Sequence, residues 1–423
     1  MIDEQALPVR LVRAVEPSPT SPTVERDVPQ AWNILAEDLS FPVCVLLRDR
    51  VEHNIAAMQR FADGAGVLLC PHGKTTMSPQ LFELQLGAGC WGLTLATADQ
   101  VQVARRHGVR RILFANELVG AADVRLICDD LRQDPGFDFF CLVDSLAGVE
   151  QLAERVAAAK PGRPLQVLLE VGFAGGRCGV RDLDTAVRVA ETVAGTEELT
   201  LAGIEGFEGL LRRDEEDAVT AVRSFLEFLV EVAEKLDRRG LLAVPDPLLS
   251  AGGSSYIDLV VETLTSARLT GAARIVLRSG CYVTHDHGMY DELLDGIRER
   301  AGAAAPSLQP ALEVWGQVLS RPEPELAIVS AGRRDFGHDA GYPRPVKHAK
   351  RGASAPSSIA NEWSVAAVSD QHAHVRIPPD APVEVGDLVG LGPSHPCTTF
   401  DKWRDIYLVD PDYRVVDVVR TWF

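Results

Sequence analysis

Lys74 is the first residue whose type and position could do covalent chemistry. It lies in the segment CPHGKTTMSP, directly after an apolar run that ends at Cys70. Barrel enzymes carry their chemistry at the C-terminal ends of their strands, so a lysine here would project into the mouth of a barrel. Its amine could form a Schiff base with a carbonyl cofactor. Taken alone, however, this lysine is more simply interpreted as a solvated surface charge.

Three glycine-containing turns follow other apolar runs and could hold an anionic cofactor. The turn GFAGGRCGV (172–180) carries Arg177, which would point toward the same mouth unless the turn is an ordinary surface loop. The turns SAGGSS (250–255) and RSGCYVTHDHGMY (278–290) follow the seventh and eighth apolar runs. Barrels commonly bind phosphate at those two positions through backbone amides. The residues that suit such a site are Gly252, Gly253, Ser254, Gly280 and Cys281.

A histidine and a cysteine two positions apart could hold a metal ion. His395 and Cys397 lie in the segment GPSHPCTTFDKW (392–403), and in an extended turn both side chains can face one ion. Imidazole and thiolate together favour Zn²⁺, and two protein ligands leave positions for water or substrate. A buried histidine beside an unrelated cysteine is the alternative. Other candidate ligands are His285, His287, His372 and His374.

Eight short apolar runs predict parallel strands that are covered on both faces. Longer amphipathic segments separate them, such as 78–89, where Ser78 could cap a helix, and 217–240, which ends at a glycine. This alternation favours an α/β fold with a (β/α)₈ TIM-like barrel over an open doubly wound sheet, which would have fewer units or a clear phosphate fingerprint. The runs are GVLLC (66–70), WGLTL (91–95), RILFA (111–115), DFFCLV (138–143), LQVLLE (165–170), LAGIEGF (201–207), DPLLSAG (246–252) and RIVLRSG (274–280).

The pattern changes after about residue 300. Segments such as LEVWGQVLS, LAIVSAG, EWSVAAVS, HAHVRI and DLVGLG are short, rich in β-branched residues and separated by Pro/Gly turns. They predict an antiparallel β domain over residues 304–423, after a barrel over 38–303. Residues 1–37 hold five of the 26 prolines, and they predict an extended arm that could add a strand elsewhere.

Charge and composition exclude several classes of partner. The 423 residues carry 42 basic and 60 acidic side chains, a net charge of −18, which disfavours nucleic acid and anionic membrane surfaces. No apolar run approaches the ~20 residues of a membrane span, and the N-terminus lacks an apolar signal stretch, so a cytoplasmic protein is expected. The eight cysteines include no CxxC pair, so no disulfide framework is expected.

Six sequence blocks together resemble the family of D-serine dehydratases and D-threonine aldolases. These are pyridoxal-phosphate enzymes with an alanine-racemase-type (fold-type III) barrel and a C-terminal β domain. The resemblance runs from about residue 38 to the C-terminus, and the order and spacing of the blocks make it specific. The blocks are PHGKT, the E-x-x-x-x-G-x-R-x-G run from Glu170 to Gly179, SAGGS, RSGCYVTHD, SDQH and SHPCTTFDKW.

The resemblance implies a role for each matched residue. Lys74 would bind pyridoxal 5'-phosphate as a Schiff base with His72 beside it, and Arg177 would approach the ring nitrogen. The two late turns would bind phosphate, with Tyr282 as a further contact. His395 and Cys397 match the family's metal pair, for which Zn²⁺ is the expected ion and another divalent metal the alternative.

The same resemblance favours a dehydratase over an aldolase. Aldolases tend to carry aspartate where Cys397 stands, and the stretch GIEGFEGLL (203–211) lacks the histidine of an aldolase base. Phe207 also stands where the family usually has tyrosine. The expected reaction is elimination of water from D-serine, D-threonine, threo-3-hydroxyaspartate or a related D-β-hydroxy amino acid. A retro-aldolase, a racemase and a non-catalytic cofactor-binding protein are the alternatives, and a homodimer is expected by analogy.

Overall fold

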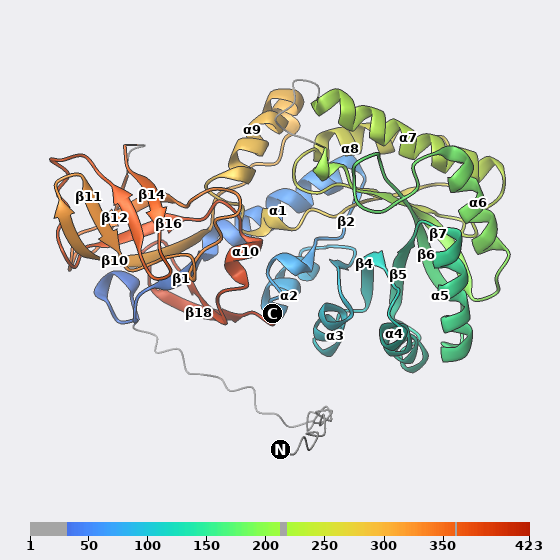
Figure 1. The fold of residues 1–423 in the computed structure, drawn as a ribbon, viewed down its shortest axis with the longest axis horizontal. Coiled ribbons are helices and arrows are strands. Elements are labelled where there is room, and N and C mark those ends of the chain that lie inside the picture. The colour runs from blue at the N-terminus through green and yellow to red at the C-terminus, as the bar shows by residue number, and fades with distance from the viewer. Residues whose placement is uncertain (1–31, 212–217, 360–361) are drawn as a thin grey trace, which may run out of the picture.

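The computed structural model describes residues 32–211, 218–359 and 362–423, so most of the predicted arm lies outside the described residues. Two sheets organise the described chain, and Figure 1 shows them next to each other. One has eight parallel strands with helices around it, and the other has ten strands that are almost all antiparallel.

All eight predicted barrel strands are present, which confirms the (β/α)₈ prediction. They pair in parallel in the order β2-β9-β8-β7-β6-β5-β4-β3, and a helix follows each of them. The strands are β2 (Leu68–Leu69), β3 (Leu93–Leu95), β4 (Arg111–Glu117), β5 (Asp138–Val143), β6 (Leu165–Val171), β7 (Leu199–Gly206), β8 (Leu248–Ala251) and β9 (Arg274–Leu277). The helices that follow them are α2 (Pro79–Gly87), α3 (Ala98–Arg106), α4 (Ala121–Gln133), α5 (Leu146–Ala159), α6 (Leu183–Ala194), α7 (Ala218–Arg238), α8 (Ile257–Leu264) and α9 (Met289–Ala301).

Hydrogen bonds between the two end strands complete the ring. The amide of Trp91 donates to the carbonyl of Leu69 at 2.8 Å, and the amide of Thr94 donates to the carbonyl of Pro71 at 2.9 Å. The hydroxyl of Thr94 adds a bond of 2.6 Å to the carbonyl of Cys70. The loop that carries Lys74 therefore starts at the seam where the barrel closes.

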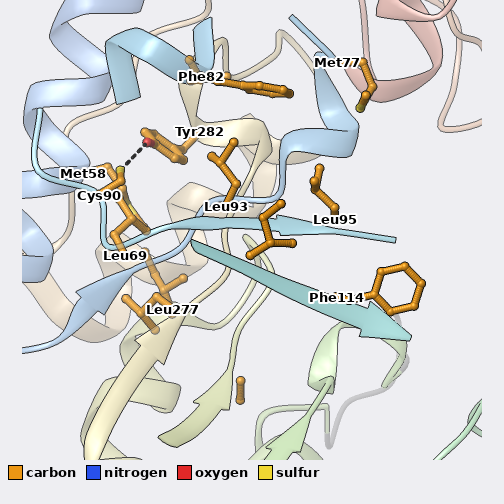
Figure 2. Close-up of a cluster of buried hydrophobic side chains, with 14 of the residues drawn as sticks. Met58, Leu69, Met77, Phe82, Cys90, Leu93, Leu95, Phe114, Leu277 and Tyr282 are labelled. Atoms are coloured by element: carbon orange, nitrogen blue, oxygen red, sulfur yellow. Dashed lines mark hydrogen bonds between the residues drawn. The ribbon is translucent and has the colours of Figure 1, made fainter. Parts of the chain in front are cut away.

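Apolar side chains pack behind this loop and hold it in place. Figure 2 shows Phe82 from α2 and Leu93 and Leu95 from β3 in this cluster, where each is almost fully buried. A Cβ atom at Gly73 would lie 3.0 Å from the side chains of Leu95 and Phe82. The backbone just before Lys74 is thus packed against the barrel wall, which fixes the position from which the lysine side chain extends.

The second sheet confirms the predicted antiparallel β domain. The five segments expected as strands correspond to β10, β11, β14, β15 and β16, and the structure adds further strands around them. The strands after the barrel are β10 (Leu312–Glu323), β11 (Leu326–Val329), β12 (Arg344–Ala349), β13 (Ser357–Ser358), β14 (Ser364–Val368), β15 (Ala373–Arg376), β16 (Leu388–Gly392), β17 (Asp405–Val409) and β18 (Val415–Arg420).

Strand β1 (Val43–Leu47) departs from the predicted boundary between the domains. It falls in the range 38–303 expected for the barrel, yet it pairs antiparallel with β10 and parallel with β17. Figure 1 shows it in blue among the orange and red strands. Its five residues are all buried, and such an apolar strand suits the centre of either sheet, so the local pattern cannot tell which one it joins. A bridge between Asn33 and Arg414 also ties the end of the arm to this domain.

Two connections bring the domains together at the mouth of the barrel. Helix α1 (Arg48–Ala65) runs from β1 to the first barrel strand. The short helix α10 (Cys397–Phe400) packs against the 3₁₀ turn Gly73–Thr75 that carries Lys74. In the part of the chain that the structure describes, no helix has the length and apolar character to cross a membrane.

Candidate active site

A cavity of about 440 Å³ opens at the C-terminal end of the barrel and is roofed by the β domain. Every barrel strand or the loop after it contributes to its lining. The lining includes every residue predicted for the site except Tyr282. These residues are His72, Lys74, Arg177, Gly252, Gly253, Ser254, Gly280, Cys281, His395 and Cys397.

Tyr282 is the predicted site residue that does not line the cavity. Only 2% of the residue is exposed, and its hydroxyl accepts a hydrogen bond of 3.0 Å from Gln85. Figure 2 shows it among apolar side chains, with its hydroxyl near the thiol of Cys90. An aromatic side chain in this short apolar-flanked turn packs into the core, so only its backbone remains near the turns that line the cavity.

Lys74 lies between two buried residues but is itself exposed to the cavity. His72 lies just before it, and Nδ1 of this histidine is buried without a hydrogen-bond partner among the described residues. Burial, followed by the positive charges of Lys74 and Arg278, lowers the pKa of His72 well below its usual value. The histidine is therefore neutral, and its ring offers an unsatisfied polar atom beside the lysine.

The turn after β8 is held by a carboxylate that the sequence pattern did not single out. Glu208, which is fully buried, accepts hydrogen bonds from the amides of Gly252 at 3.0 Å and Gly253 at 3.1 Å. Both glycines line the cavity as predicted, but an anion would reach these two amides only by displacing Glu208. Ser254 and Gly280 line the cavity beside them.

Buried acidic and basic side chains form the floor of the cavity. Glu205 and Arg278 make an ion pair, and both are at least 95% buried. Oε2 of Glu205 and Nε of Arg278 have no hydrogen-bond partner within the described chain. Burial, followed by the negative charge of Glu205, raises the pKa of Glu170 to about 9, so Glu170 is a neutral acid at pH 7. These unsatisfied groups are the kind that a polar cofactor or substrate would complete.

Arg177 reaches the cavity across the loop after β6. The carbon of its guanidinium lies 5.2 Å from the ring centroid of Phe207, which is within the range of a cation–π contact. Phe207 in turn packs on the Gly253 backbone, because a Cβ atom there would lie 2.8 Å from its ring. The phenylalanine thus links the arginine to the turn after β8.

The β domain supplies a histidine whose ring orientation is fixed by a hydrogen-bonded carboxylate. Nδ1 of His395 donates to Oδ2 of Asp339 at 2.7 Å, and Thr398 donates to the other oxygen of Asp339 at 2.6 Å. Burial opposes a charge on His395, but hydrogen bonds with Cys397 and Asp339 raise its pKa to about 9. A carboxylate behind a histidine is the usual arrangement at metal-ligating imidazoles. Asp339 was missed by sequence reasoning, and the segment GHDAG was its only signal.

Cys397 lies against a second thiol inside the cavity. Its Sγ is 3.4 Å from Sγ of Cys281 and 3.4 Å from Oγ1 of Thr75. Hydrogen bonds from Cys281 and then from His395 lower the pKa of Cys397 well below its usual value, although burial opposes this. A thiolate is the form that binds a metal ion. All eight cysteines are free in the structure.

The other candidate ligands lie elsewhere. None of the four histidines lines the cavity. His372 is exposed, and His374 lies on β15. Nε2 of His285 lies 3.6 Å from Oδ1 of Asp291, and the side chain of His287 is almost fully buried. The side chains of Arg333, Arg334 and Arg344 bond to Val368, Asp370 and Glu292, so they too lie outside the lining. A further group of donors, Glu117, Asp144 and Cys178, has its ligand atoms within 4.8 Å of one another near the loop after β6.

The residues present fit both groups that the fold family implies. A reachable lysine amine, cavity-lining glycine turns and two arginines suit pyridoxal phosphate, and the unpartnered atoms of His72 and Arg278 leave polar groups for it to satisfy. An imidazole oriented by a carboxylate beside a stabilised thiolate suits a borderline-soft divalent metal such as Zn²⁺.

Comparison with known proteins agrees with this arrangement. The family model "Alanine racemase, N-terminal domain" matches residues 47–269, and the model "Putative serine dehydratase domain" matches residues 311–409. Among curated proteins, a D-threonine aldolase of Arthrobacter sp. is 26% identical over 87% of this chain and 88% of its own length. A D-threo-3-hydroxyaspartate dehydratase of Delftia sp. is 29% identical over 72% of this chain and 75% of its own length.

Solved structures share the whole fold. The D-threonine aldolase of Filomicrobium marinum superposes with a TM-score of 0.75 at 23% identity, covering 91% of this chain and 95% of the other. The Delftia sp. dehydratase superposes with a TM-score of 0.72 at 23% identity, covering 92% and 99%. The racemase-type model alone matches more than half of the chain. The chain therefore belongs to the D-serine dehydratase and D-threonine aldolase family of alanine-racemase-type, pyridoxal-phosphate-dependent lyases.

Proposed function

We propose that the protein is a dehydratase that eliminates water from a D-β-hydroxy amino acid and yields a 2-oxo acid and ammonia. D-serine, D-threonine and threo-3-hydroxyaspartate are the candidate substrates. The observation that carries this proposal is the meeting of Lys74 with His395 and Cys397 in one cavity, although the pair comes from a different domain. An amine and a soft metal-ligand pair in one cavity match a reaction that moves a proton and expels a hydroxyl group.

Two bound groups would supply the chemistry that side chains lack. When bound, pyridoxal phosphate would accept electrons from the α-carbon of the substrate, and a metal ion, for which we propose Zn²⁺, would polarise the β-hydroxyl. Lys74 would hold the cofactor, His395 and Cys397 would hold the metal, and Arg177 would lie near the ring. Their common cavity is the support for these roles.

In this proposal Lys74 would take a proton from the substrate. Its amine is the exposed basic group of the 3₁₀ turn that lines the cavity, and Nζ would accept the α proton of a bound substrate. The enamine that leaves would hydrolyse in solution to the 2-oxo acid and ammonia.

The β domain would orient and activate the leaving hydroxyl. Asp339 holds His395 with its Nδ1 turned away from the cavity, which leaves Nε2 as the nitrogen available to a metal.

A retro-aldol cleavage of the same substrates is the second candidate. It is favoured by the activities of the relatives, since the curated relatives that match over 87% of this chain are aldolases of D-threonine and of 3-hydroxy-D-aspartate. Cys397, where aldolases tend to carry aspartate, favours elimination.

By analogy with related barrels we further propose that the protein is a cytoplasmic homodimer. Sedimentation of the purified protein would measure its oligomeric state.

Replacing Lys74 tests the cofactor site. We expect Lys74→Ala to lose both the visible absorbance of lysine-bound cofactor and the release of ammonia, because no other described lysine lines the cavity. Lys350→Ala, at an exposed turn of the β domain, is the matched control and should keep both. Unchanged absorbance and turnover in Lys74→Ala would contradict the proposal.

Replacing His395 tests the metal site separately. We expect His395→Ala to retain bound cofactor while ammonia release is abolished, because this histidine is a metal ligand and not a cofactor contact in the proposal. His372→Ala, at an exposed position outside the cavity, should behave as the unmodified protein does. Full turnover in His395→Ala after zinc has been lost would remove the metal from the reaction.

A further inference from the structure

Glu208 occupies an unusual position for a carboxylate, because it lies at the turn where an anionic phosphate is expected. It begins the 3₁₀ turn Glu208–Leu210 that follows β7, and none of its surface is exposed. Burying an ionised carboxylate without partners is costly. Its two oxygens are satisfied by the consecutive amides of Gly252 and Gly253, at 3.0 Å and 3.1 Å.

The same two glycines are held on their other side by the loop after β9. The carbonyl of Gly252 accepts from the amide of Arg278 at 3.1 Å, and the carbonyl of Gly253 accepts from the hydroxyl of Ser279 at 3.0 Å. Every backbone polar group of the glycine pair therefore has a partner. Glu208 provides one side of this clamp, and the loop after β9 provides the other.

The local conformation depends on glycine at both positions. Gly252 has φ of +101°, which disfavours any side chain, and a Cβ atom at Gly253 would lie 2.8 Å from the ring of Phe207. A turn made of glycines is mobile unless it is held, because glycine has the largest conformational freedom to lose. The clamp is thus what gives this turn one conformation.

The turn leads directly into residues of the cofactor cavity. Ser254 and Ser255 follow the glycine pair and line the cavity, opposite Gly280 and Cys281 from the loop that the clamp also engages. Moving the glycine pair would shift both walls together. The conformation set by Glu208 therefore decides where the backbone and hydroxyl donors of this end of the cavity lie.

We propose that Glu208 is a positioning residue for the cofactor's phosphate, which holds the turn at Gly252 and Gly253 so that Ser254, Ser255 and the loop at Gly280 form the phosphate site. This rests on the proposed use of pyridoxal phosphate. Glu208 touches neither the phosphate nor the substrate in this role. The opposite possibility is that its carboxylate occupies the phosphate position and must leave when the cofactor binds.

The ratio of two affinities tests this role. Pyridoxal phosphate and pyridoxal differ only in the phosphate, so their dissociation constants should be measured for the full-length protein and for Glu208→Gln and Glu208→Ala. We expect Glu208→Ala to bind pyridoxal phosphate about tenfold more weakly, because the amides of Gly252 and Gly253 lose their acceptors and the turn that forms the phosphate site is no longer held. The affinity for pyridoxal, which has no phosphate, should change little. Glu208→Gln should show a smaller loss, because its amide keeps one acceptor oxygen but turns a donor toward the other glycine.

Matched controls separate positioning from general stability. Glu313→Gln replaces another fully buried carboxylate, which accepts hydrogen bonds from Trp315 and Tyr413 in the second sheet outside the cavity, and its affinity ratio should not change. Melting temperatures without cofactor show whether each variant is folded. If Glu208→Ala does not fold, the nearly isosteric Glu208→Gln decides.

Three results would overturn the inference. The first is an unchanged ratio in folded Glu208 variants, and the second is an equal loss for pyridoxal and pyridoxal phosphate. The third is tighter binding of pyridoxal phosphate, which would mean that Glu208 competes with the phosphate. The test needs no turnover, so a protein that binds the cofactor but eliminates no water would refute the proposed function and leave this inference standing.

Discussion

The imidazole of His395 is held by a carboxylate at Nδ1, which suits it to the metal-ligand role that we propose for it. Asp339 accepts from Nδ1, and Thr398 holds Asp339 in turn. Such a carboxylate fixes the tautomer and ring orientation of a ligating histidine and raises its basicity. The metal affinity of the site should therefore depend on a residue that does not touch the metal.

Replacing Asp339 should weaken metal binding without removing a ligand. We expect Asp339→Asn to raise the zinc dissociation constant by about tenfold, as the loss of an outer carboxylate commonly does. Competition with a chromophoric chelator measures this directly. Asp370→Asn removes an exposed carboxylate of the same domain that pairs with Arg334, so it should leave the affinity unchanged. Equal affinities for Asp339→Asn and the unmodified protein would show that Asp339 does not orient His395.

The sequence predicted ten of the residues that line the cavity but not those that support them. Lys74, Arg177, His395 and Cys397 stand in short distinctive motifs, so their types and spacing could be recognised. Asp339 acts on His395 across 56 positions, and Glu208 acts on Gly252 across 44 positions. These contacts depend on how loops are folded against one another, and no local pattern records that. The burial of Tyr282 could not be predicted for a related reason, because the path of a side chain into the core is set by its neighbours.

The loop between β9 and α9 is organised by one buried carboxylate. Oδ1 of Asp286 accepts from the amides of Gly288 and Tyr290 at 2.9 Å and from that of Asp291 at 3.3 Å. These amides lie at the start of α9, which begins at Met289. Its other oxygen is buried without a partner in the described structure. Burial raises the pKa of Asp286 from 3.8 to about 7, against the effect of these amide bonds. Folding therefore favours the protonated acid at this position.

The pH dependence of stability should reveal this carboxyl group. Because its pKa is higher in the folded than in the unfolded state, its contribution is full below about pH 4 and is lost as the pH rises toward 7. Asp286→Asn keeps an acceptor for the amides but cannot ionise. We expect the free energy of unfolding of the variant, relative to the unmodified protein, to rise by about 1 kcal/mol per pH unit across this range.

Urea unfolding of the metal-free protein at pH 5, 6 and 7 measures this difference. Other titrating groups, such as Glu170, contribute equally to both proteins and cancel in the comparison. Parallel pH profiles for the two proteins would mean that Asp286 ionises in the folded state as readily as in water.

The elements of the barrel could be predicted because each carries its own signal. Continuous apolar runs such as LQVLLE are buried on both faces as strand β6, where six of the seven residues are buried. Strand β1 carries the same kind of signal, but its partners β10 and β17 lie more than 260 positions later in the chain. An apolar run predicts that a strand is central without telling which sheet contains it. The sequence therefore predicted the strands better than the boundary between the domains.

The two domains complete one site because the chain ties them together at several places. Strand β1 starts in the second sheet and leads through α1 into the barrel, and near the other end of the chain the amide of Trp422 donates to the carbonyl of Met77 at 2.9 Å. Between these two contacts, Sγ of Cys397 lies 3.4 Å from Oγ1 of Thr75 in the barrel. The relative placement of the domains could not be read from the sequence, because it depends on these few long-range contacts.

The global charge of −18 does not describe this site. Arg177, Arg278 and Lys74 gather around the cavity, so an anionic amino acid would meet local positive groups within an acidic molecule. Screening limits the reach of distant charges to about 8–10 Å at physiological ionic strength, so the nearby cations decide what binds.

The most direct test of the proposed elimination is the identity of the products from one substrate. The full-length protein, loaded with pyridoxal phosphate and Zn²⁺, should be given D-threonine, and all products should be quantified by NMR together with ammonia release. Elimination predicts 2-oxobutanoate and ammonia in equal amounts that match the D-threonine consumed, and no glycine. Glycine and acetaldehyde in place of the oxo acid would contradict the elimination and establish the retro-aldol reaction.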